Sequence, residues 1–448
     1  MHANDEHTRP VTAPAPSRSF RQIPPAIYIA LAAHIAGATA NVIAMQLASG
    51  SYIERILATR RWQLLYQGCN IVFAILLALG LAELARRLTG RSRALTRAGA
   101  YVGLTGLLWT VAWPLVDILD PSFEQVRRIQ EWLSFAVSLG VLVSAVLLTL
   151  GSNAWRRAPA AAALLVAIYA TGYGIPVIGP AITAALGGDP MTQQLHGLAR
   201  IVLHAIAVLP IAATLAASGR EPPPEPRAAR AGLRLARGVL LFRVVAACLI
   251  SVLLVGGRSP GAAKIVQLGG PAVVAITMLV LAIAILRVAH ARVMGLPPVS
   301  LSLGAALTLG WGTIQLQQLS TIVRSLRDSH LRDEALAISG WFSIAGPLAA
   351  ALGLALVGSA IAALARSRGD HPLRDAATSR TTCFLVLTLA SVGLSTQLAK
   401  ASTLSGLLAV GLLASLLGIV ALGALVGLFE RAAEALTAEP ELPPARLV

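Results

Sequence analysis

Long apolar segments, separated by short clusters of charged residues, recur along the whole 448-residue chain. Most of these segments approach or exceed the ~20 residues that a helix needs to cross the hydrocarbon core of a bilayer. Only 12% of the residues are charged, whereas soluble globular proteins have about 25%. This pattern excludes an ordinary soluble enzyme and a disordered protein, and it predicts an all-α integral membrane protein in contact with the lipid bilayer.

Twelve apolar runs can be separated, which predicts a polytopic bundle of about 12 transmembrane helices. We expect spans near residues 27–49, 63–84, 98–118, 131–151, 159–186, 194–218, 238–256, 265–288, 300–323, 336–365, 382–399 and 403–429.

A segment rich in proline and arginine divides these runs into two sets of six, and its prolines interrupt any continuous helix. The sequence thus predicts a flexible N-terminal tail at 1–24, a six-helix half at 25–218, a cytoplasmic linker at 219–237, a second six-helix half at 238–430 and a C-terminal tail at 431–448.

The basic residues, which give the chain a formal net charge of +16, lie mainly between the apolar runs. With both termini in the cytoplasm, the cytoplasmic segments hold roughly twice as many basic residues as the external ones, as the positive-inside bias requires. We therefore expect a multi-pass protein of the plasma (inner) membrane with both termini cytoplasmic. Because aromatic residues do not alternate with the basic ones, no nucleic-acid partner is expected.

His196, Arg200 and His204 follow a spacing of four within the sixth expected span, so they lie along one side of a helix. An arginine at hydrocarbon depth is expected to face the bundle interior, an anion or a water-filled cavity. His34 and Asn41 lie two helical turns apart in the first span and can meet that side. One interpretation is an anion site or proton relay. The other places His196 and Arg200 at the outer interface, which leaves only His204 buried.

A polar stripe runs along the ninth expected span, where Gln317, Ser320, Thr321 and Arg324 follow helical spacing. Such a stripe either lines a pathway or packs against a neighbouring helix through hydrogen bonds. Gln317 and Arg324 are therefore pathway candidates, together with the residues around Arg200.

Asp117, Asp120 and Glu124 loosely resemble the first aspartate-rich motif of membrane prenyltransferases, which implies Mg²⁺ held against a diphosphate. The simpler interpretation is the start of a helix, with Asp120 as N-cap and Glu124 in the first turn. The three cysteines lie in apolar segments without other ligands at metal-binding spacing, and no histidines are paired as haem would require. We expect no metal and no cofactor.

The segment Gly80–Arg93 places a glycine and an acid ahead of a group of basic residues that surround a second glycine. With twelve spans and a central linker, this segment resembles a degraded form of the major facilitator pattern. The aspartate expected directly before Arg86 is missing, and the equivalent loop at 287–298 lacks the motif. The resemblance covers 14 residues, so it serves as an architectural analogy for a transporter.

These features favour a transporter-like permease for a small solute, with an anion as one option. The alternatives are a membrane-embedded transferase that uses the acidic loop with Mg²⁺, and a non-catalytic subunit of a larger complex. The residues do not assign an enzymatic activity, and the oligomeric state is not predicted.

Overall fold

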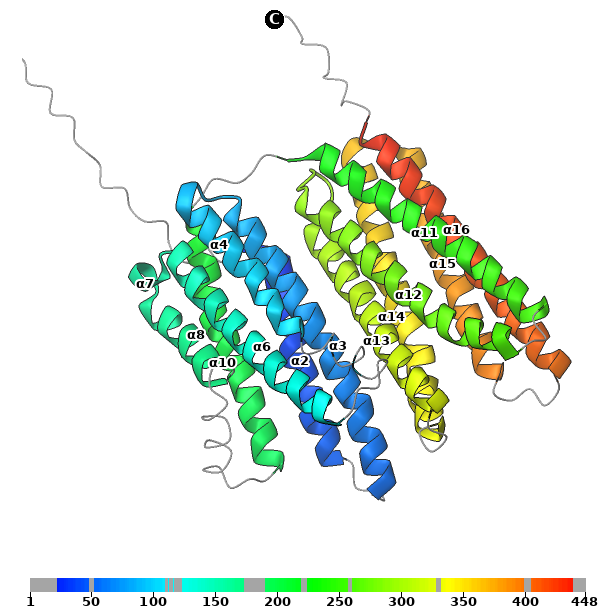
Figure 1. Cartoon of the computed structure of the whole chain (residues 1–448). Coiled ribbons are helices and arrows are strands. Elements are labelled where there is room, and N and C mark those ends of the chain that lie inside the picture. Colours follow the sequence, from blue (N-terminus) through cyan, green and yellow to red (C-terminus); the bar gives the residue numbers. More distant parts are fainter. Residues whose placement is uncertain are drawn as a thin grey trace, which may run out of the picture.

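A computed structural model describes residues 22–47, 52–108, 112, 116, 123–172, 190–218, 224–256, 260–327, 332–398 and 404–437. Within these ranges every regular element is a helix (Figure 1). The elements are α2 (Pro25–Leu47), α3 (Tyr52–Ala85), α4 (Gly90–Val102), the 3₁₀ helix η1 (Gly103–Leu107), α6 (Phe123–Gly151), α7 (Ala154–Arg157), α8 (Pro159–Gly172), α10 (Pro190–Ala217), α11 (Pro226–Gly256), α12 (Pro260–His290), α13 (Pro298–Arg327), α14 (Arg332–Arg368), α15 (His371–Leu398) and α16 (Leu404–Ala435).

Ten helices in this part of the chain are long and apolar enough to cross a membrane, which confirms the expectation of a helical, multi-pass membrane protein. The two other expected spans, 98–118 and 159–186, are not among the ten. The first coincides with α4, η1 and several residues outside the described ranges. The second is represented by α8, which has 14 residues and is too short for a full crossing, and by residues 173–189, which lie outside the described ranges.

Proline marks where many of these helices begin. Six of the described helices, namely α2, α8, α10, α11, α12 and α13, start at a proline. Proline suits the first helical position because the missing N–H has no acceptor there, and its fixed φ already matches the helix. The segment expected to be a linker, 219–237, is helical from Pro226 onward, so its basic residues form the first turns of α11.

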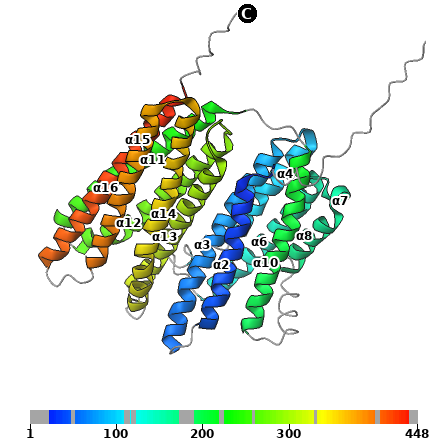
Figure 2. The ribbon, with the colours of Figure 1, turned by 180° about the vertical axis from the view of Figure 1, so that it is seen from behind.

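The helices pack in two groups that each close on themselves (Figure 1). In the first group α2 packs on α3, α3 on α4, α4 on α6, α6 on α8, α8 on α10, and α10 returns to α2. In the second group α11 to α16 pack in chain order, and α16 returns to α11. The groups meet where α2 and α3 face α13, and where α3 also touches α14 (Figure 2).

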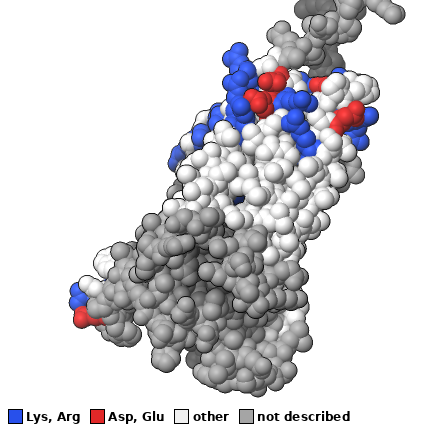
Figure 3. Space-filling model, turned by 90° about the vertical axis from the view of Figure 1, so that its right-hand side faces the viewer, with Lys and Arg blue, Asp and Glu red and all other residues white. Residues whose placement is uncertain are grey.

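Charged side chains gather at one end of the molecule, above a broad uncharged band (Figure 3). At this end the carboxylate of Glu83, on the last turns of α3, accepts a hydrogen bond of 2.8 Å from Nε of Arg292. Nε2 of His290 lies 3.3 Å from the same carboxylate. Arg86 forms an ion pair with Glu225, whose backbone N–H donates to the carbonyl of Ala291. This network ties the first group to the end of α12.

Candidate functional site

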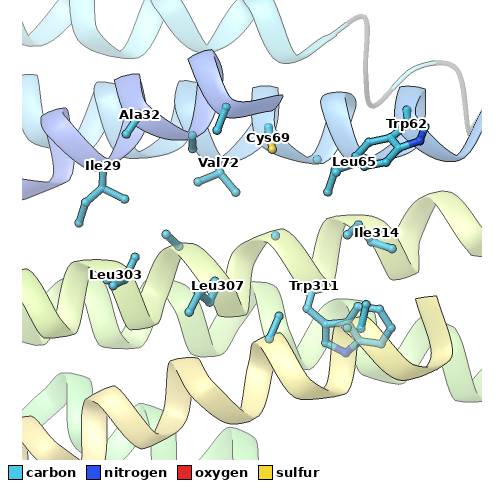
Figure 4. Close-up of a pocket in the computed structure, with 18 residues that line it drawn as sticks. Ile29, Ala32, Trp62, Leu65, Cys69, Val72, Leu303, Leu307, Trp311 and Ile314 are labelled. Atoms are coloured by element: carbon cyan, nitrogen blue, oxygen red, sulfur yellow. The ribbon is translucent and has the colours of Figure 1, made fainter. Parts of the chain in front are cut away.

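A cavity of about 660 Å³ lies where the two groups meet, between α2 and α3 on one side and α13 and α14 on the other (Figure 4). Its lining is almost entirely apolar. Leu303 and Ile314 of α13 lie across from Trp62 and Cys69 of α3, whereas Trp311 of α13 lies toward α14. The volume falls within the ~300–1,000 Å³ that is usual for small-molecule sites.

Small residues create this space, because each of the four helices lines it with at least one alanine or glycine, and these side chains leave room between the helices. The cavity residues of α3 recur every three or four positions from Trp62 to Val72, so they share one helical face. Gly346 of α14 leaves room for the indole of Trp311, since a Cβ at this glycine would lie 1.6 Å from the ring. Trp311 is consequently buried, at 5% exposure, and forms part of the cavity wall.

The structure brings His34 and His204 together inside the first group. The sequence analysis expected that the side of the first span with His34 can meet the side of the sixth span with His204. The phenyl ring of Phe73 contacts both imidazoles, with ring centroids 4.2 Å from His34 and 5.5 Å from His204. The guanidinium of Arg200, which is half-buried, acts electrostatically on both histidines. A second cavity, of about 50 Å³, adjoins His204 and has room for a few water molecules.

Sequence reasoning missed three partners of these histidines. The side chain of Asn70 acts on His34 from α3, and the hydroxyl of Tyr169 lies 2.6 Å from Nε2 of His204. The signal on α3 was available, because Asn70 and Phe73 follow a helical three-residue step along one face. For Tyr169 the sequence offers no equivalent signal, since the ten residues of α8 before it are all apolar and give no polar spacing on its face.

We expect Tyr169→Phe to destabilise the first group by about 1 kcal/mol. The substitution keeps the aromatic ring but leaves Nε2 of the buried His204 without its hydroxyl partner, and buried hydrogen bonds between membrane helices contribute about this much. Thermal unfolding in lipid nanodiscs measures the effect. Tyr101→Phe serves as the matched control, because Tyr101 is 42% exposed. Equal unfolding temperatures for both variants would contradict the proposed bond.

The polar stripe of α13 begins one turn beyond the cavity. Gln317 donates from Nε2 to Oε1 of Gln67 on α3, at 2.9 Å, and thereby connects the two groups. Gln318 accepts from Gln315 at 2.6 Å. All three glutamines of α13 are buried. These hydrogen bonds are the helix packing that was one of the two interpretations of the stripe. Gln317 also follows the cavity residue Ile314 by three positions on α13.

The remaining sequence candidates have fewer described contacts. Asn41 is half-buried on α2, beyond His34. His196 and Arg324 belong to α10 and α13, but their side chains lie outside the described part of the structure. Asp117 and Asp120 also lie outside it, whereas Glu124 forms an exposed ion pair of 2.7 Å with Arg128 in the first turns of α6.

Arg243 is an intramembrane arginine that the sequence analysis passed over. It lies on α11 along the same face as the buried residues Ala236 and Leu240, and its Nη1 is 3.6 Å from Sδ of the buried Met278. The available signal was the same as for Arg200, namely a single arginine within a long apolar run. Among the described residues, no group of three or more His, Cys, Asp or Glu side chains is arranged to hold a metal ion.

No protein-family model, curated protein or solved structure matches this chain. The resemblance of Gly80–Arg93 to the major facilitator pattern therefore stays an architectural analogy, and the function has to be argued from the geometry alone.

Proposed function

We propose that the chain is a multi-pass permease of the plasma membrane that makes twelve crossings in two six-helix halves, with both termini cytoplasmic. Two features support this arrangement. Each group closes into a ring of six helical segments if α4 with η1, and α8, are counted as positions in the first ring. The start of α11, where the basic residues of the central linker lie, belongs to the charged end, because Glu225 directly before it pairs with Arg86.

The observation that carries the proposal is the cavity between the two groups. Transporters built from two halves place their solute near the bilayer midplane, at the interface between the halves. In support of such a position, the cavity lies between the two groups, and each of α2, α3, α13 and α14 contains a stretch long and apolar enough to cross a membrane. Its volume of about 660 Å³ suits a small solute.

The cluster of His34, Arg200 and His204 forms a separate and smaller compartment in this proposal. It lies within the first group, and its His204 lines the cavity of about 50 Å³. We assign to it a water molecule or small ion that accompanies the solute. Arg200→Ala and His204→Ala are the variants that address this role. A transferase would need the acidic loop, of which the described part, Glu124, is engaged with Arg128.

A native cysteine allows the permease proposal to be tested without knowledge of the solute. Cys69 lines the cavity, whereas Cys248 and Cys383 are exposed on the surface of the second group. In the Cys248→Ala/Cys383→Ala background, Cys69 is the single thiol. We expect maleimides whose charged, membrane-impermeant head is joined to the reactive ring by an alkyl tether to modify Cys69 in right-side-out and in inside-out vesicles. The uncharged ring can enter the apolar cavity while the head stays in water, and a permease exposes its solute site to both faces in turn.

Ala36→Trp, which places an indole in the cavity opening, is expected to block this modification from both faces. Ala163→Trp is the matched control, since Ala163 is exposed on α8, away from the cavity. Modification of Cys69 from one face only, or from neither, would contradict alternating access and favour the non-catalytic subunit.

A further inference from the structure

The lining of the large cavity indicates which solutes it accepts. Among the described residues that line it, none is charged, and the walls that they form consist of alanine, glycine, aliphatic side chains, two tryptophans and the thiol of Cys69. An ion that enters such a space loses its hydration and gains no partner, which costs several kcal/mol or more. The cavity therefore favours an uncharged solute with an apolar body.

The position of the opening indicates where this solute comes from. Ala32, Ala36 and Leu303 line the cavity and are themselves exposed. Ala32 and Ala36 lie seven and eleven residues into α2, which places them about 10–17 Å from the start of the helix at 1.5 Å per residue. That depth is within the hydrocarbon core of about 30 Å. An apolar molecule can thus enter from the bilayer without crossing a charged surface.

One helical turn past the last described cavity residue of α13 lies a polar group without a hydrogen-bond donor. On α13 the cavity face reaches Ile314, and Gln317 follows three residues later on the same face. Nε2 of Gln317 is used by Gln67, but Oε1 of Gln317 is buried and accepts no hydrogen bond from any described residue. A buried carbonyl oxygen without a donor is costly, so a ligand that brings a hydroxyl or amide N–H gains from it.

We propose that the cavity binds an uncharged amphiphile from the bilayer, with its apolar chain along Leu303, Gly310 and Ile314 and a hydrogen-bond donor at Gln317. This inference rests on the proposed function only in taking the same cavity as the solute site. It names a substrate class that differs from the anion expected on the basis of Arg200.

The test measures occupancy rather than transport. The full chain in phosphatidylcholine nanodiscs is exposed to a dodecanol that carries a photoreactive diazirine in its alkyl chain, and labelled peptides are identified by mass spectrometry. We expect labels on α3 and α13 around Trp62 and Trp311, and competition by unlabelled dodecanol. Ala36→Trp is expected to abolish this labelling, while Ala163→Trp retains it. Ala306→Trp fills the cavity from the other group and provides a second blocking variant.

Two further arms test the chemistry of the solute. Dodecanoate, which has the same chain length but a negative charge, is expected not to compete. Gln317→Leu is expected to weaken competition by dodecanol about fivefold to tenfold, the effect of one buried hydrogen bond, and to leave competition by dodecane unchanged.

Equal competition by dodecanoate, or unchanged labelling in both blocking variants, would overturn the inference. An unchanged preference for dodecanol over dodecane in Gln317→Leu would overturn the role of Gln317. Specific labelling combined with one-sided access to Cys69 would contradict the permease and leave this inference standing. Two-sided access to Cys69 without specific labelling would support the permease and overturn this inference.

Discussion

Gly346→Ala is expected to reduce the yield of correctly folded protein sharply, although it adds only one methyl group. The new Cβ would lie 1.6 Å from the indole of Trp311, so the ring must leave its position in the cavity wall. Trp311 is 5% exposed, so the displaced ring has to repack inside the bundle, at the expense of its contacts with α14. We expect a loss of about 3 kcal/mol, the upper part of the usual range for overpacking. Size-exclusion profiles and unfolding by SDS titration measure the change.

Gly310→Ala provides a matched control on the same cavity. There the added Cβ meets its nearest neighbour, Val72, at 3.6 Å, which is ordinary van der Waals contact. This variant is expected to behave like the native chain. The double variant Gly346→Ala/Trp311→Ala should recover part of the yield, because the clashing ring is gone. If Gly346→Ala and Gly310→Ala unfold alike, the close packing of Trp311 against α14 is wrong.

Glu83→Gln is expected to destabilise the junction at the charged end by about 3 kcal/mol. The carboxylate of Glu83 is almost completely buried and faces both Arg292 and His290. Removing one partner of a buried ion pair leaves an uncompensated charge, which typically costs about 3–5 kcal/mol. We place the effect at the low end because 22% of the Arg292 side chain stays exposed. SDS titration in mixed micelles gives the free energy of unfolding.

An exposed ion pair in the same chain supplies the comparison. Glu124 and Arg128 are one turn apart, and both side chains are 69% exposed. Glu124→Gln is expected to change stability by less than about 0.5 kcal/mol, since solvent already screens such pairs. The double variant Glu83→Gln/Arg292→Gln should be more stable than Glu83→Gln alone. A similar effect of Glu83→Gln and Glu124→Gln would show that the buried network does not hold the junction.

Membrane insertion was predictable from the sequence because it depends on the length and apolarity of single segments, which are local properties. The same information placed His34 and His204 on faces that could meet, since helical spacing fixes which residues share a side. The count of twelve crossings stays a prediction, because the expected spans 98–118 and 159–186 lie partly outside the described residues.

The large cavity could not be predicted in this way. It arises from residues of four helices, and each of these residues reads as ordinary apolar packing by itself. Ala32 and Leu303 are 271 positions apart in the chain, so only the packing of the two groups makes them neighbours. A charged residue stands out within an apolar run, and for that reason the sequence pointed to Arg200. The side chains that form the large cavity are small and apolar, and such residues do not stand out in this sequence.

The closure of each six-membered group has a consequence for how this chain can vary. Since α10 returns to α2 and α16 returns to α11, every helix has two neighbours before the groups meet. Each bundle therefore has contacts of its own that do not pass through the shared wall. Substitutions in the cavity lining that avoid tight contacts such as Gly346 with Trp311 can change the shape of the chamber while both rings of helices persist.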